Sequence, residues 1–89
     1  LPNMASGNVA MRFGANGICK SINTACASSN DAIGDAFRAI KFGFQDLMLV
    51  GGSEASITPF AIAGFQALTA LSTTEDPTRA SIPFDKDRN

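Results

Sequence analysis

Cys26 is the side chain of this sequence best suited to covalent chemistry. It stands in a run of small residues, Ala25-Cys26-Ala27-Ser28-Ser29. Small neighbours leave room for a substrate carbonyl, and a backbone N–H at a helix start can help to hold an oxyanion. A thiol reacts as its thiolate, and helix N–H dipoles lower a thiol pKa from its usual value of about 8.5. We therefore predict a nucleophile, with a buried structural cysteine as the alternative, because free cysteine is among the most buried residue types.

Two periodic segments must position this cysteine. Residues 18–24 alternate between two faces, which predicts a short strand. After Asn30, apolar residues recur at helical spacing, namely Ile33, Ala36, Phe37 and Ile40. The predicted helix of about 16 residues ends near Gly43, which can take the left-handed conformation of a closing turn. Its charges match the helix dipole, with acids in the early turns (Asp31, Asp35) and bases in the last (Arg38, Lys41).

The next segment predicts the fold class. Residues 46–50 form a continuous apolar run, typical of a strand buried on both faces of a parallel sheet. Together with the first strand and the helix they would form a β-α-β unit, so we expect an α/β fold. Gly51-Gly52 lacks the lysine of a Walker loop, and we interpret the pair as a tight exit with close packing. For Glu54 we favour a buried, hydrogen-bonded structural role over a catalytic one.

Further helices are expected on either side of this unit. Residues 3–13 form a small-residue helix that ends in the turn of residues 14–17. Thr58 and Pro59 are a helix start, with threonine as the N-cap and proline at the first position. The helix runs from Phe60 to about Leu71. Phe65 lies on its core-facing side, where ordinary packing is the simplest interpretation.

Composition limits the classes of function. The chain has 89 residues, is 45% hydrophobic and carries a net charge of −1. It is long enough for one small domain at most. A short chain with so much apolar residue content is typical of the interior of a larger protein. The charge argues against a nucleic-acid partner, and no apolar run reaches the roughly 20 residues that span a bilayer.

The same counts bear on cofactors and location. There is no histidine, and the two cysteines lie seven residues apart, which fits no zinc or redox motif, so we predict no metal and no cofactor. A Cys19–Cys26 disulfide is conceivable, but it would consume the predicted nucleophile. Without a signal-peptide layout we expect a cytoplasmic protein. Leu1 opens the chain without an initiator Met, so we expect an internal fragment with no complete domain.

Several motifs, in order, resemble the β-ketoacyl-acyl-carrier-protein synthases of the type II elongating class, condensing enzymes of the thiolase-like superfamily. The nucleophile segment of that family is similar to residues 23–29. Other matches extend over almost the whole chain, at residues 3–7, 51–55, 63–65, 70–73 and 83–88.

The resemblance implies that residues 1–89 are part of the N-terminal half of a thiolase-like α/β/α/β/α fold, in a homodimeric enzyme. It implies that Cys26 takes a fatty acyl group from the phosphopantetheine arm of acyl-carrier protein. Malonyl-carrier protein then loses carbon dioxide and attacks that thioester. Phe65 matches an aromatic residue that lines the acyl pocket. The family's two histidines and distal Gly-Phe-Gly segment are missing here, so the 89 residues alone are predicted to be inactive.

Three alternatives share parts of this pattern. One is the ketosynthase domain of a polyketide or fatty-acid megasynthase. A non-catalytic partner subunit replaces the nucleophile, so the presence of Cys26 argues against it. A pure acyl-binding module would use the Phe65 side alone. An α/β-hydrolase is disfavoured, because the turn has no G-x-S-x-G pattern.

Overall fold

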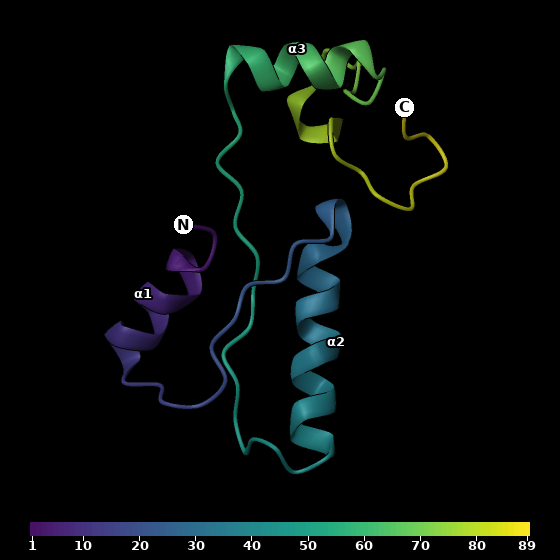
Figure 1. Cartoon of the computed structure of the whole chain (residues 1–89). Helices are drawn as coiled ribbons and strands as arrows, with labels where there is room; N and C mark the ends of the chain where they lie inside the picture. The colour runs from purple at the N-terminus through teal and green to yellow at the C-terminus, as the bar shows by residue number, and fades with distance from the viewer. The chain divides into compact units, whose positions relative to one another are not determined.

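All regular elements of the chain are helical in the computed structural model, which describes residues 1–89 (Figure 1). They are the α-helices α1 (Met4–Phe13), α2 (Ser28–Lys41) and α3 (Pro59–Ala67), and the short 3-10 helices η1 (Ala25–Ala27) and η2 (Pro77–Arg79). The chain divides into two compact units, Leu1–Glu54 and Ala55–Asn89. None of its helices combines the length and the apolar character needed to cross a bilayer.

Helix α1 begins and ends where its sequence predicts. Asn3 is the N-cap residue, and Gly14 closes the helix with a φ of 64°. The Gly14 N–H donates to the carbonyl of Ala10. Glycine takes this left-handed conformation without the steric penalty that a Cβ imposes.

Helix α2 spans 14 residues, with Asp31 in its first turn and basic residues in its last. Gly43 follows with a φ of 77°, which is the closing conformation predicted for it. The predicted apolar face is largely uncovered. Ala36 is buried, whereas the side chains on the same face are 52% (Ile33), 60% (Phe37) and 43% (Ile40) exposed.

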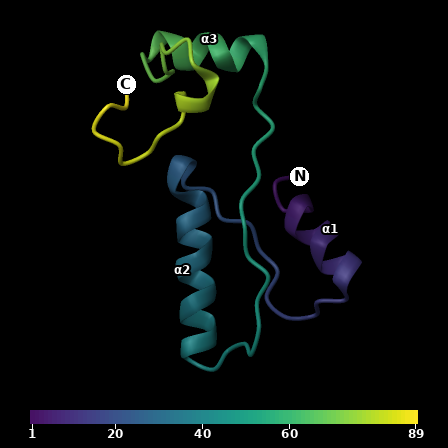
Figure 2. The same cartoon turned by 180° about the vertical axis from the view of Figure 1, so that it is seen from behind.

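The two predicted strands are not formed, so the prediction of a β-α-β unit is wrong for this chain. Residues 18–24 and 46–50 are non-helical, and no backbone hydrogen bond joins one segment to the other. A strand exists only where a neighbour pairs its N–H and C=O groups. Both segments nevertheless run beside α2, as Figures 1 and 2 show. Lys20 from the first segment and Met48 from the second line one groove together with Asp35 of the helix.

An ion-pair network ties the first of these segments to α2. The Lys20 ammonium contacts one carboxylate oxygen of Asp35, and the Arg38 guanidinium lies 3.3 Å from the other. The hydrogen bonds from Lys20 and then Arg38 hold the pKa of Asp35 below its usual value of 3.8. Because water reaches all three side chains, the network orients the segment more than it stabilises the unit.

Helix α3 starts at the predicted threonine cap. The Thr58 hydroxyl accepts a hydrogen bond from the Ala61 N–H at 3.3 Å, and Pro59 is the first helical residue. The helix ends at Ala67 and not near Leu71, because Thr69 turns the chain with a φ of 54°. In the segment that follows, the Asp76 carboxylate accepts a hydrogen bond from the Thr78 N–H at 2.9 Å and so caps η2.

Very little apolar surface is buried within either unit. Ala36, 6% exposed, is the one buried residue, and no large side chain is buried. Burial of apolar surface is the main favourable contribution to the free energy of folding, and it must exceed the loss of conformational entropy. Neither unit therefore has the core that independent stability requires.

We predict that the isolated 89-residue chain does not unfold cooperatively on heating. Far-UV circular dichroism is expected to fall gradually with temperature, and calorimetry is expected to show no heat-absorption peak, since there is no packed core to lose at one temperature. A sigmoidal transition that coincides with a calorimetric peak would show that the chain folds by itself.

Candidate functional site

Cys26 lies at the centre of η1, two residues before the first residue of α2. Its thiol is free and the residue is exposed, as is Cys19. The structure thus places Cys26 at the helix mouth, where the sequence predicts it. The alternatives of a buried structural cysteine and of a Cys19–Cys26 disulfide do not describe this chain.

The backbone reverses sharply at the residue before the cysteine. Ala25 has a φ of 51°, in the left-handed region. For a residue with a Cβ this conformation is unfavourable by about 1–2 kcal/mol. The Ala27 N–H donates to the Thr24 carbonyl at 3.1 Å and closes the turn around Ala25 and Cys26. Cys26 is therefore presented at the tip of a tight turn.

Ser28 adds two hydrogen bonds to this turn. Its hydroxyl accepts from the Thr24 N–H at 2.9 Å and donates to the Ala25 carbonyl at 2.7 Å. Both partners precede the cysteine, whereas Ser28 follows it. Sequence reasoning assigned Ser28 only its small size. The signal that could have identified it is a serine at a helix start, three residues after a carbonyl that its hydroxyl can reach.

The start of α2 offers backbone donors beside the thiol. The N-cap residue, Ala27, makes no side-chain hydrogen bond to the helix. The first amide groups of an α-helix have no partner within it and carry partial positive charge. Such groups can stabilise the negative oxygen that forms when a thiolate attacks a carbonyl.

Gly52 comes close to the same end of α2. A Cβ at position 52 would clash with the Ser29 hydroxyl, whereas one at Gly51 would meet nothing within 4 Å. The interpretation of the glycine pair as close packing therefore holds at Gly52. Glu54 is exposed, so the expectation of a buried structural carboxylate is wrong.

Phe65, the predicted substrate-binding residue, lies on α3 with 45% of its surface exposed. It belongs to the unit of residues 55–89, while Cys26 belongs to the unit of residues 1–54. Neither unit alone contains both predicted site residues.

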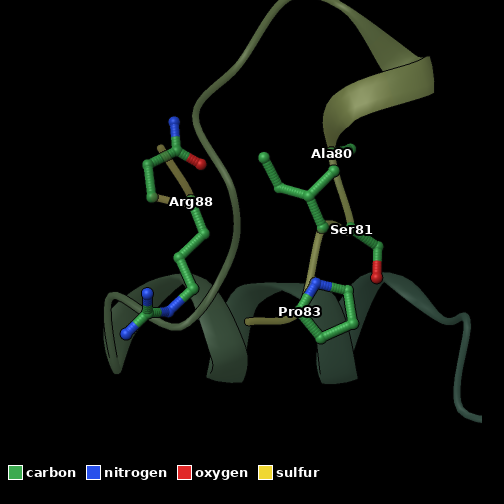
Figure 3. Close-up of a pocket in the computed structure, with 6 residues that line it drawn as sticks. Ala80, Ser81, Pro83 and Arg88 are labelled. Atoms are coloured by element: carbon green, nitrogen blue, oxygen red, sulfur yellow. The ribbon is translucent and has the colours of Figure 1, made fainter. Parts of the chain in front are cut away.

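The hollows of the surface do not coincide with these residues. One hollow of about 190 Å³ lies in the C-terminal segment (Figure 3), where Ala80, Ser81 and Pro83 occupy one stretch and Arg88 another. It is smaller than the roughly 300–1,000 Å³ of typical ligand pockets. The groove beside α2, which Lys20 and Met48 line, contains neither Cys26 nor Phe65.

Comparisons with known proteins give a consistent assignment. Residues 1–87 match the family model described as Beta-ketoacyl synthase, N-terminal domain. The chain is 50% identical over 90 residues to 3-oxoacyl-[acyl-carrier-protein] synthase 2 of Synechocystis sp., and 48% identical over 91 residues to the mitochondrial 3-oxoacyl-[acyl-carrier-protein] synthase of Arabidopsis thaliana. It is 45% identical over 89 residues to 3-oxoacyl-[acyl-carrier-protein] synthase 2 of Staphylococcus aureus.

These alignments include the whole chain but only 22%, 20% and 22% of the respective relatives. The chain thus spans about a fifth of the length of the curated relatives that it matches. The resemblance inferred from the ordered motifs is confirmed, and the family implies a thiolase-like fold. The chain belongs to the beta-ketoacyl synthase family and matches its N-terminal domain.

Proposed function

We propose that this chain provides the nucleophile of a β-ketoacyl-acyl-carrier-protein synthase that elongates fatty acids. The observation that carries the proposal is the exposed thiol of Cys26 in the turn directly before α2. The names of the relatives add the substrate class, because they are synthases of 3-oxoacyl groups on acyl-carrier protein.

The first step transfers an acyl group to Cys26. The thiolate attacks the thioester carbon of acyl-carrier protein, and a new carbon–sulfur bond forms at Cys26. The bond to the phosphopantetheine sulfur breaks, and that thiolate leaves and takes up a proton. The backbone donors at the start of α2 would hold the oxyanion between attack and departure.

The second step extends the acyl chain. Malonyl-carrier protein loses carbon dioxide, and the electron pair left on its α-carbon attacks the Cys26 thioester. The β-ketoacyl product stays on the carrier protein, and Cys26 is released as a thiolate. The sequence contains no histidine, the residue type that the family assigns to this step, so we expect the step to require groups outside the 89 residues.

The proposal extends to the setting of the enzyme. We place the chain in the N-terminal half of an α/β/α/β/α fold, in a cytoplasmic homodimer that receives its substrates from acyl-carrier protein. The resemblance implies each of these features. The near-zero net charge of −1 gives no reason to invoke a nucleic-acid partner.

We predict that Cys26 is alkylated faster than Cys19 in a complete synthase containing these 89 residues. Both cysteines are exposed, but only Cys26 adjoins a helix start, whose first backbone N–H groups lack helical partners and carry partial positive charge. Iodoacetamide below pH 8.5, followed by peptide mass spectrometry, is expected to show a ratio of rates of about ten or more. Equal rates would contradict the activation of Cys26.

We predict that Cys26→Ala removes the acyl-enzyme intermediate and lowers turnover by about 10³-fold or more, as expected when a covalent nucleophile is lost. Intact-mass measurement after mixing with acyl-carrier protein detects the intermediate. Cys19→Ala is the matched control, and it is expected to form the acyl-enzyme and to turn over at the original rate. A pure acyl-binding module would instead lose only affinity.

We predict that Phe65→Ala raises the KM for long acyl chains by roughly tenfold, because part of an apolar pocket wall is lost. The rate of acyl transfer at saturating substrate is expected to change little. Phe60→Ala provides the control, because Phe60 lies at the start of the same helix and is 91% exposed. Equal kinetics for the two variants would remove Phe65 from the acyl pocket.

A further inference from the structure

We propose that Ser28 is a positioning residue for Cys26, which it holds at the mouth of α2 by bridging the residues on either side of the cysteine. The inference rests on the proposed function, in which Cys26 is the nucleophile. We call the two hydrogen bonds, from Thr24 N–H to Ser28 Oγ and from Ser28 Oγ to the Ala25 carbonyl, the Ser28 clasp.

The clasp uses the Ser28 hydroxyl both as a donor and as an acceptor. A serine side chain has one donor hydrogen, which goes to Ala25, and acceptor lone pairs, one of which receives the Thr24 N–H. The distances of 2.7 Å and 2.9 Å are those of well-formed hydrogen bonds. Ser28 is also partly buried, while Thr24, Ala25 and Cys26 are exposed. The two hydrogen bonds themselves are exposed to water, so the clasp acts through its geometry and not through burial.

The turn needs such a constraint because Ala25 has a φ of 51°. Residues other than glycine remain in this region only where surrounding contacts hold them there. One contact is the backbone hydrogen bond from Ala27 to Thr24, and the clasp supplies the other two. Without the Ser28 hydroxyl, Ala25 is free to relax to a negative φ, which would swing Cys26 away from the helix mouth.

The Ser28 hydroxyl does not act as an ordinary helix cap. The N-cap residue of α2 is Ala27, and the Ser28 side chain points back to the residues before the cysteine. The neighbouring Ser29 differs, because its hydroxyl lies against Gly52 and takes no part in the clasp. The two serines therefore provide a test residue and a control at adjacent positions.

The clasp predicts a defect in rate and not in affinity. Displacing a catalytic group by about 1 Å can lower a rate by roughly 10²-fold. In a complete synthase containing these residues, Ser28→Ala is expected to slow single-turnover acyl transfer by about 10- to 100-fold. The KM for acyl-carrier protein is expected to stay within about twofold, because both hydrogen bonds of the Ser28 hydroxyl go to the backbone of the turn.

Rescue by a hydroxyl separates positioning from packing. Threonine can make the same bond to a carbonyl three residues earlier, whereas valine has the same shape without the hydroxyl. Ser28→Thr is expected to keep the rate within about threefold of the original, and Ser28→Val to lose as much as Ser28→Ala. Ser29→Ala should behave as the unmodified enzyme. If Ser28→Ala does not fold, the threonine and valine variants still decide.

Alkylation by iodoacetamide tests the clasp without any acyl substrate. In Ser28→Ala and Ser28→Val the ratio of Cys26 to Cys19 alkylation rates is expected to fall toward one, and in Ser28→Thr to remain high. An unchanged ratio in Ser28→Val, together with unchanged acyl transfer, would overturn the inference. If instead the unmodified enzyme forms no acyl-enzyme at Cys26, the proposed function fails, and the alkylation ratios still report on the clasp.

Discussion

The left-handed turn at Ala25 is the constraint on which the arrangement of this chain depends. It converts an extended approach into the start of α2 within a few residues, and it leaves Cys26 exposed at the tip. The segment before Ala25 and helix α2 after it are connected at two places. Ser28 joins them beside the cysteine, and the contact of Lys20 with Asp35 joins them again about two helical turns further along α2. The same few contacts thus determine both the position of Cys26 and the way in which the preceding segment lies against α2.

Features that depend on neighbouring residues could be predicted from the sequence. The threonine and proline that begin α3, the glycines after α1 and α2, and the charges at the two ends of α2 all lie where they were expected. Each follows from the local needs of a helix end, where backbone groups lack partners. The position of Cys26 could be predicted for the same reason.

Features that need a distant partner could not be predicted. Residues 18–24 and 46–50 have the patterns of strands, but a pattern specifies only a face, and a sheet also requires backbone groups to pair with. The apolar face of α2 likewise predicts burial that only Ala36 achieves. The role of Ser28 could not be predicted either, because it depends on the direction of one hydroxyl, which residue type alone does not determine.

The close approach of Gly52 to Ser29 also limits how this chain can vary. A methyl group at position 52 would force the Ser29 hydroxyl into another rotamer and would still press on the Ser29 Cβ at 3.1 Å. Since Ser29 belongs to the first turn of α2, the pressure would reach the end of the helix that carries the thiol. A residue far along the chain, without any reactive group, thereby restricts the space available to the nucleophile.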